Sequence, residues 1–409
     1  MKRRTVLQLG LAASAQSLLP LLPLQLWAAP SSSADAPRLL VVFLRGAYDA
    51  ANLLVPTSSS FYYEARPNIA IAKAAALPLD ADWGLAPALN ESLYPLWQKG
   101  QLAFIPFAGT HDTSRSHFET QYHIELGQPD DPAGGNRDFR SGFMNRLAGV
   151  LGVGTPASSR LEAMAFTDQV PLILRGTLPV GNQALRDLGK PGINAAQANT
   201  IASMYAGTRL AGTVSGGFEV RDEVTRSMAG EAGEMEAASR NAIAAKGFAL
   251  EARRIARLMR ERVSLGFIDV GGWDTHVGEG GATGQLANKL GELGKGLALF
   301  ADEMGPQWAN TTVVVVSEFG RTFRENGNRG TDHGHGSTYW VLGGGVKGGR
   351  VVGEQVAVNA GTLFQNRDFP VLNEYRATLG GLFKRLYGLN DAQLATVFPG
   401  ASARDVGLI

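Results

Sequence analysis

The sequence contains no cysteine, which excludes disulfide bonds and metal sites built on thiolates. Histidine is also scarce, with 6 residues in a chain of 409. Any metal ion must therefore be held by carboxylates, imidazoles, hydroxyl groups or water. Segments where two histidines stand close together are the first places to look for such a site.

An excess of charge of one sign is lacking as well. The chain has 38 lysines and arginines against 37 aspartates and glutamates, a formal net charge of +1. This balance gives no electrostatic reason to expect nucleic acid or an anionic membrane surface as a partner. We therefore expect neither, and the oligomeric state is not indicated.

The N-terminus reads as an export signal. A long apolar segment follows Lys2-Arg3-Arg4 and runs to about Trp27, where small residues begin. The paired arginines indicate a twin-arginine signal peptide over residues 1–29 and export to the periplasm or beyond. The alternative is an N-terminal membrane anchor. We favour the cleaved signal, no stable membrane insertion afterwards, and a single domain over residues 36–409.

Continuous apolar runs predict an α/β fold with a mostly parallel sheet that is covered on both faces. Four of these runs end in a polar, glycine-containing segment. In a parallel sheet such strand ends share one edge, where ligands bind. The strands are expected at residues 38–44, 101–107, 265–270, 312–316 and 339–342, with a helix at 285–303 and a cap or insertion around 124–260.

Two segments with histidines predict metal binding. Asp274 and His276 are two residues apart just past a predicted strand, so in an extended segment both side chains point to one face. The later segment places Asp332, His333 and His335 among glycines, where side chains can converge on an ion. We expect the two segments to form two walls of one crevice.

Acidic residues follow two of the other strands. Asp49 lies just past residues 38–44, where its alternative role is a turn or a helix cap. Glu318 and Arg321 come directly after the strand at 312–316. If the strands are parallel, these side chains meet the histidine segments at the same edge.

A candidate nucleophile follows the strand at 101–107. Ser114 or Ser116 stands where a helix begins, and free backbone N–H groups there would help to activate an attacking hydroxyl. In the alternative interpretation one serine caps the helix, and His117 and His123 are surface residues.

Five segments of the mature chain carry specific motifs: FLRGAYDAANLLVP (43–56), RSHFETQ (115–121), GGWDTH (271–276), SEFGRT (317–322) and ENGNRGTDHGHGSTYWVLGGGVKGG (325–349). Together with the twin-arginine start, they resemble the DUF1501 family of secreted bacterial proteins. That family is grouped with the alkaline-phosphatase-like superfamily. The similarity runs through nearly all of the mature chain.

The resemblance implies an alkaline-phosphatase-like three-layer fold with metal ions at the strand ends and a serine or threonine that attacks phosphate or sulfate. Where the superfamily usually has an adjacent Asp-His pair, this chain has Glu318-Phe319. Either Asp332 or a second histidine replaces the missing imidazole, or the site holds one metal ion. The implied metal ligands are Asp49, Asp274, His276, Glu318, Asp332, His333 and His335, with Ser116 as nucleophile and Arg115 or Arg321 on the oxyanion.

We therefore expect an exported metal-dependent hydrolase of phosphate or sulfate esters. Its cofactor would be one or two divalent ions, Zn, Mn, Ca or Mg, and its substrate a small-molecule or glycan ester. The alternative is a non-catalytic exported protein that uses the fold and a metal to bind a glycan, because a fold does not settle function.

Overall fold

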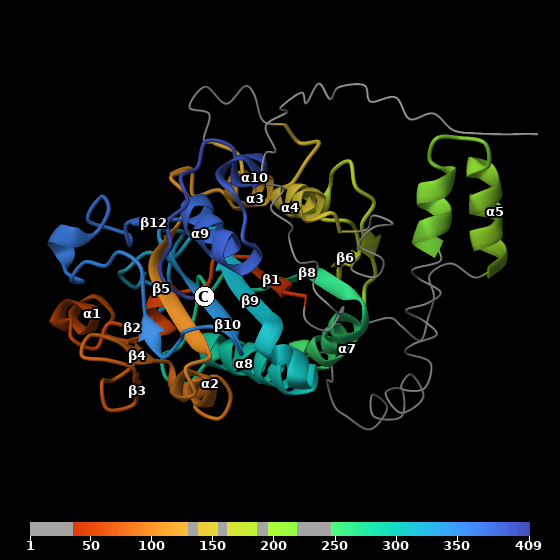
Figure 1. Cartoon of the computed structure of the whole chain (residues 1–409). Coiled ribbons are helices and arrows are strands. Elements are labelled where there is room, and N and C mark those ends of the chain that lie inside the picture. Colours follow the sequence, from red (N-terminus) through yellow and green to blue (C-terminus); the bar gives the residue numbers. More distant parts are fainter. Residues whose placement is uncertain (1–35, 130–137, 154–161, 186–194, 219–246) are drawn as a thin grey trace, which may run out of the picture.

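The computed structural model describes residues 36–129, 138–153, 162–185, 195–218 and 247–409. Its centre is a mostly parallel sheet between two layers of helices, so the predicted three-layer α/β architecture is confirmed (Figure 1). The predicted signal peptide lies outside the described residues. Among the helices that are described, none is long and apolar enough to cross a membrane.

The strands of the central sheet are, in spatial order, β11 (Arg350–Val351), β5 (Leu102–Gly109), β10 (Ser337–Gly343), β9 (Thr311–Ser317), β1 (Arg38–Leu44), β8 (Val263–Val270), β6 (Glu162–Ala165) and β7 (Gly181–Asn182), with β12 (Asn373–Glu374) also paired to β5. All five predicted strands are present. Only β10 runs antiparallel to its neighbours, β5 and β9. Its first residue therefore lies at the edge where β1, β5, β8 and β9 end.

Both faces of the sheet are covered, which explains why its strands are apolar without alternation. In β1, Leu40 and Val42 pack into one buried cluster, whereas Leu39 and Val41 pack into the other. The parallel neighbours β8 and β9 hold this strand in the middle of the sheet. The segments that leave these strands are thus anchored on a rigid base.

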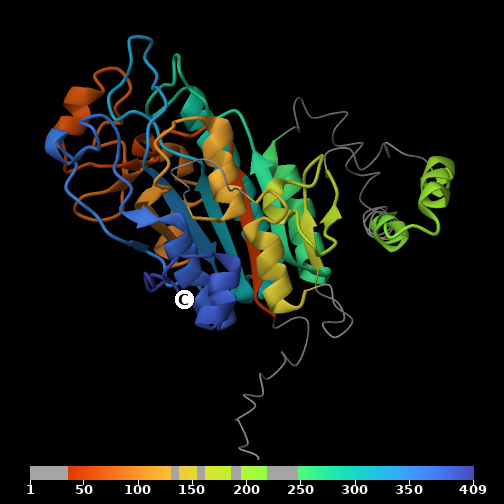
Figure 2. The same cartoon turned by 90° about the horizontal axis from the view of Figure 1, so that it is seen from above.

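One helical layer packs on the first cluster and the other on the second (Figure 2). The first layer contains α2 (Tyr94–Gln98), α7 (Phe248–Glu261) and α8 (Gln285–Met304), and the second contains α3 (His117–Leu126), α4 (Phe143–Leu151), α9 (Tyr375–Tyr387) and α10 (Asp391–Val397). The helix predicted at 285–303 is α8. The remaining elements include α1 (Ser60–Ala65), α5 (Ala195–Tyr205) and a small sheet of β2 (Leu54–Val55), β4 (Gly84–Leu85) and β3 (Leu77–Pro78).

Part of the segment 124–260, expected as a cap or insertion, belongs to the central layers, whereas α5 (Ala195–Tyr205) joins neither buried cluster. The segment's strands β6 and β7 extend the central sheet beyond β8. Its helices α4 and α7 pack on opposite faces of that sheet. These residues therefore continue the three layers.

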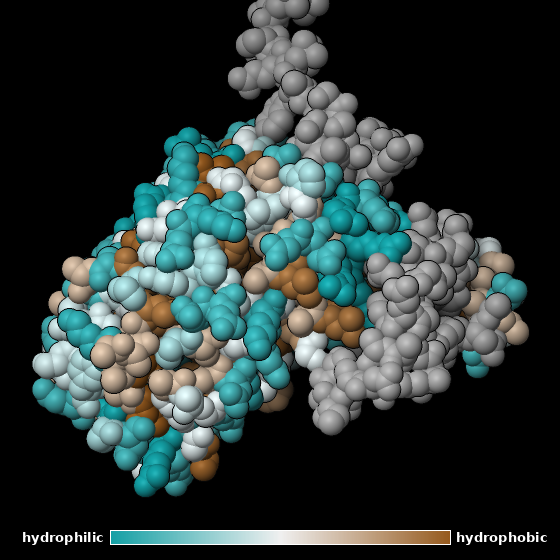
Figure 3. All heavy atoms as spheres, turned by 90° about the horizontal axis from the view of Figure 1, so that it is seen from below, coloured by the Kyte–Doolittle hydropathy of each residue, from teal (hydrophilic) through white to brown (hydrophobic). Residues whose placement is uncertain are grey.

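Where described residues form the molecular face on the side of α7 and α8, no apolar area dominates (Figure 3). Figure 3 views the molecule from below, and hydrophobic residues there are scattered among hydrophilic ones. Single apolar residues on a protein surface are ordinary. This face gives no reason to place a site away from the strand ends.

Candidate metal centre

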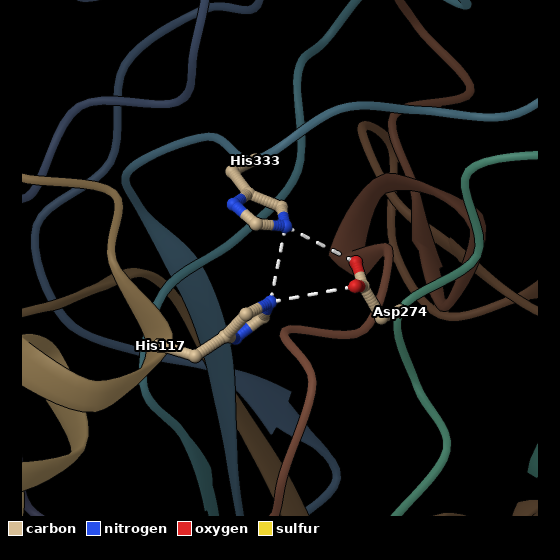
Figure 4. A group of neighbouring side chains, drawn as sticks. All are labelled: His117, Asp274 and His333. Carbon is tan, nitrogen blue, oxygen red and sulfur yellow. Dashed lines mark hydrogen bonds and ion pairs between the residues drawn. The ribbon is translucent and has the colours of Figure 1, made fainter.

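Side chains from separate segments meet at the edge where the parallel strands end. His117 is the first residue of α3, which follows β5, while Asp274 and His276 follow β8. His333 precedes β10 and reaches the same edge because β10 is antiparallel. Figure 4 shows His117, Asp274 and His333 pointing toward one another.

The ligand atoms of these side chains lie close enough together to bind one ion. His117 Nε2 is 3.0 Å from His333 Nε2 and 3.5 Å from Asp274 Oδ2. His333 Nε2 is 3.2 Å from Asp274 Oδ1, and the ligand atoms of this trio all lie within 4.8 Å of one another. His276 joins the group with Nε2 2.8 Å from Asp274 Oδ1 and 3.2 Å from His333 Nε2.

Hydrogen bonds at Nδ1 fix the tautomers of His117 and His333. The Nδ1 atom of His117 is 2.8 Å from a carboxylate oxygen of Glu318, and that of His333 is 3.0 Å from the carbonyl oxygen of Arg115. Because these oxygens accept hydrogen bonds, we assign the ring proton to Nδ1 in each neutral imidazole. Burial, and then the charge of His117, lower the pKa of His333, which favours its neutral form. The Nε2 atom of each ring then faces the shared centre. The hydrogen bond with Glu318 raises the pKa of His117, which favours a proton on this ring that a bound ion would displace from Nε2.

The same arrangement holds for His276. Its Nδ1 lies 3.3 Å from Asp332 Oδ1, and this oxygen also accepts a hydrogen bond of 3.0 Å from Asn326. Nε2 of His276 is therefore the atom left for an ion. Asp332, a predicted ligand, contacts the outer side of His276 and orients its ring.

The Nε2 atoms of His117 and His333 and the carboxylate of Asp274 face one another, and either a shared proton or a cation between them relieves their repulsion. Zinc bound tetrahedrally at about 2.0–2.1 Å from nitrogen separates its ligands by roughly 3.3–3.4 Å. The two nitrogens lie 3.0 Å apart, near that value, and Asp274 approaches them through different oxygens, Oδ2 at 3.5 Å from His117 and Oδ1 at 3.2 Å from His333. A set rich in imidazole suits zinc and similar transition ions better than calcium or magnesium, which prefer oxygen ligands.

Glu318 was a predicted metal ligand, but it contacts Nδ1 of His117, on the side of the ring away from the centre. Its buried carboxylate accepts hydrogen bonds from His117, from Gln121 at 3.0 Å and from the backbone N–H of Gly46 at 2.8 Å. Burial alone would raise the pKa of Glu318, yet these donors, His117 first, lower it. An ionised carboxylate behind an imidazole increases its strength as a ligand.

Arg321 also contacts a candidate ligand, Asp274, from the side. Its buried guanidinium donates from Nη1 to Asp274 Oδ1, from Nε to Thr331 Oγ1 at 3.1 Å, and from Nη2 to the carbonyl oxygen of Thr331. Burial alone would raise the pKa of Asp274, but the hydrogen bond and charge of Arg321 lower it. All three nitrogens of Arg321 are engaged, so this side chain orients Asp274 and keeps it ionised.

Arg115 and the two serines lie at the start of α3. The Arg115 guanidinium pairs with the buried carboxylate of Asp368 at 2.7 Å. Ser116 Oγ accepts a hydrogen bond of 3.5 Å from the backbone of Glu119 as the cap of α3, and Ser114 Oγ donates to Asp112 at 2.8 Å. Ser116 is thus a helix cap that stands directly beside a candidate ligand.

Asp49, another predicted ligand, is not in the group. It is fully buried against Arg66, whose Nη2 is 3.0 Å from Asp49 Oδ1 and whose Nη1 contacts the other oxygen. Burial alone would raise the pKa of Asp49, but the Arg66 guanidinium holds it below its ordinary value. The positive charge that a second metal ion would supply is therefore already present.

His335, also a predicted ligand, lies apart from the group, with its ring 4.7 Å from that of Phe364.

Glu279 connects the buried ion pair of Asp49 to the metal centre. It hydrogen-bonds to Asp49, and its Oε2 accepts from Thr275 at 2.9 Å and from Thr331 at 2.8 Å. Burial, followed by the charge of Asp49, raises the pKa of Glu279 well above its ordinary value. Glu279 is therefore the neutral partner that donates to ionised Asp49, while Thr331 links it to Arg321.

A glutamine at position 279 is expected to preserve folding. The raised pKa means that folded wild type binds more protons than unfolded chain, so its stability falls as pH rises above about 4.5. Glu279→Gln keeps a donor toward Asp49 and does not titrate, so near pH 7 it should be at least as stable as wild type. Glu279→Ala should lose about 1–3 kcal/mol. Urea unfolding at about pH 5 and pH 7 tests this, and equal losses in both variants would contradict it.

Sequence reasoning missed His117 as part of the centre. It was expected to be either one of several polar residues after β5 or a surface histidine. The available signal was its position at the start of a helix that leaves a buried strand, next to the serine chosen as nucleophile. Its distance to Glu318 and His333, about 200 positions further along the chain, could not be read from the sequence.

Glycines allow the loop before β10 to approach the other segments. A Cβ on Gly334 would lie 2.4 Å from the backbone of Arg321, and one on Gly330 would lie 2.3 Å from the carbonyl oxygen of His276. His333 and Arg321 form an isolated antiparallel bridge at the same place. The glycine-rich pattern thus reflects close backbone contact that sets His333 beside Asp274.

The fold and this geometry define a three-layer α/β protein with a candidate metal centre of histidines and an aspartate at the carboxyl edge of its sheet. The family described as "Protein of unknown function (DUF1501)" matches residues 36–398, and the chain belongs to this family. No curated protein matches the chain, nor does any solved structure.

Proposed function

We propose that the chain is a metal-dependent hydrolase of phosphate or sulfate esters that acts in the periplasm or outside the cell after twin-arginine export. The observation that supports this most is the convergence of His117 Nε2, His333 Nε2 and the Asp274 carboxylate at the strand ends, with His276 Nε2 next to the last two. Open α/β sheets bind their substrates at that edge. An ion held there would polarise an ester oxygen and lower the pKa of a coordinated hydroxyl group.

The residues of the chain have distinct parts in this proposal. His117, Asp274, His276 and His333 hold the ion. Glu318 and Arg321 orient His117 and Asp274 through the hydrogen bonds described above. Since Asp49 is neutralised by Arg66, we propose one ion per chain, with zinc or a similar transition ion favoured by the donor set.

Ser116 is the proposed nucleophile. It lies at the N-terminus of α3 next to His117, where backbone N–H groups stabilise negative charge. Its Oγ would form a bond to phosphorus or sulfur as the ester bond breaks, and the proton of the serine hydroxyl would pass to the leaving alcohol. Water would then release the phosphate or sulfate from the serine. Arg115 and Arg321 are engaged by Asp368 and Asp274, so we assign them no contact with the oxyanion.

Ser116→Ala is expected to lower ester turnover by at least about 100-fold while the bound metal is retained. Loss of the helix cap should also reduce stability by about 1 kcal/mol. The measurement is turnover on phosphomonoesters, phosphodiesters and sulfate esters, together with elemental analysis of the variant. Ser114→Ala is the matched control and should keep turnover near that of wild type.

Metal removal gives an independent test of the whole proposal. Chelation should abolish turnover, and zinc or manganese at one equivalent per chain should restore it. Wild-type protein that holds one ion but is inactive on every ester class would contradict the hydrolase. Persistent glycan binding in that case would favour the non-catalytic alternative.

A further inference from the structure

Large apolar side chains are exposed at the positions that directly follow two of the candidate ligands. Phe118 follows His117 and is 75% exposed, and Val277 follows His276 and is 62% exposed. These two residues come from segments that leave different strands. Exposed apolar side chains at a group of polar ligand atoms are typical of a surface that contacts another molecule.

The apolar surface continues along α3 from Phe118. Tyr122 lies one helical turn further on the same face and is 37% exposed. Its ring packs edge-to-face on Phe139, which is 46% exposed, with 5.4 Å between the ring centres. A row of aromatic side chains therefore starts next to His117.

A second group of exposed large apolar side chains is present in the described residues. Their other exposed large apolar side chains are Met204, Tyr205 and Leu210, in or next to α5. The exposed large apolar side chains of the described residues therefore gather in two places, at or after the strand ends and around α5. Packing alone gives no reason for a phenylalanine at position 118, since its ring is mostly in water.

The charged side chains near the centre also favour a ligand with an apolar part. Arg115 and Arg321 are paired with carboxylates, so neither guanidinium is left to bind a highly charged substrate. Affinity must then come in part from contacts to the uncharged portion of the molecule. Aromatic faces stack well on flat apolar ring faces.

We propose that Phe118 and Val277 form an apolar rim around the centre, and that this rim binds the ring of a ring-bearing ester, with the phosphate or sulfate group at the metal. The proposal rests on the proposed function, because it names the substrate class of that site. Phe118 stacks on the ring face, while Val277 bounds it on the side of His276. Both sugar and aryl rings present such a face.

The test compares ligands that differ only in the ring. Zinc-loaded wild type should bind phenylphosphonate about three- to tenfold more tightly than methylphosphonate in calorimetry. Phe118→Ala should lose this preference while its zinc content and its affinity for methylphosphonate stay unchanged. Tyr205→Ala, which removes an exposed aromatic ring from α5, is the control and should behave as wild type. A second pair, glucose 1-phosphate and glycerol phosphate, distinguishes a sugar ring from an aryl ring.

The outcomes separate this proposal from the hydrolase itself. If no ester is turned over but Phe118→Ala abolishes a measured ring preference, the rim is supported and the hydrolase is wrong. If wild type binds ring and ringless ligands equally, or binds neither, the rim is wrong whether or not esters are hydrolysed. An unchanged preference in Phe118→Ala also contradicts the rim.

Discussion

The His333→Gln variant is expected to lose its metal ion and, as a consequence, its ester turnover. Nε2 of His333 lies 3.0 Å from His117 Nε2, 3.2 Å from His276 Nε2 and 3.2 Å from Asp274 Oδ1, so it is the atom that the other ligands share. Changing a residue that only supports a ligand costs about 10–100-fold in metal affinity, so removing a ligand should cost more than about 100-fold. Zinc titration and elemental analysis measure the loss.

His335→Gln is the matched control for this substitution. His335 is only two positions away, but it is buried beside Phe364, and burial lowers its pKa to about 4, so its ring is neutral near pH 7. Glutamine is also neutral, and we expect a stability loss of about 0.5–3 kcal/mol with full metal content. If His335→Gln lost the ion and His333→Gln kept it, our assignment of the ligand would be wrong.

Replacing Arg66 by methionine is expected to destabilise the fold by about 3–5 kcal/mol, because the charge of Asp49 would remain buried without its partner. Arg66 also donates to the carbonyl oxygens of Phe323 at 2.6 Å and Thr322 at 3.1 Å, and these acceptors would lose their donor. Urea unfolding near pH 7 measures the change. The folded variant should still bind one metal ion, since neither residue contacts the centre.

The loss of stability in Arg66→Met should depend on pH, and the pKa of Asp49 sets the direction of that dependence. The lowered pKa of Asp49 stabilises wild type above the unfolded value of about 3.9, and this contribution is lost as pH falls through the folded pKa. Without Arg66 the pKa of Asp49 should rise, so the deficit of Arg66→Met should be large near pH 7 and smaller near pH 4. The double variant with Asp49→Asn should recover part of the loss. A deficit independent of pH would contradict the ion pair as its cause.

Local sequence information was sufficient for the five long strands of the sheet, but not for the short strands β6, β7, β11 and β12. The run at 38–44 and the four others are apolar at most positions, without alternation, because both of their faces are buried, and this composition is visible without any knowledge of neighbours. Asp274 and His276 were also found locally, since they directly follow such a run. Each of these predictions depends on residues that are adjacent in the chain.

The sequence was ambiguous where the site depends on loop paths. His333 and His335 share a segment and a residue type, yet only His333 meets the centre, because the loop pairs with Arg321 there and bends at His335. Asp49 and Glu318 follow strands as predicted, but Arg66 and His117 stand against them. A carboxylate has the same appearance in a sequence whether it faces a metal ion, an arginine or the back of an imidazole.

By itself, the sequence determined that a covered, mostly parallel sheet would present polar segments at its strand ends, since burial on both faces imposes its composition on contiguous residues. The tertiary structure alone decided which of those polar groups face one another. It did so through the reversed direction of β10, which brings His333 to the edge where β5 and β8 end, and through His117 at the start of α3. Such contacts join residues far apart in the chain, and their geometry is set by packing of the whole fold.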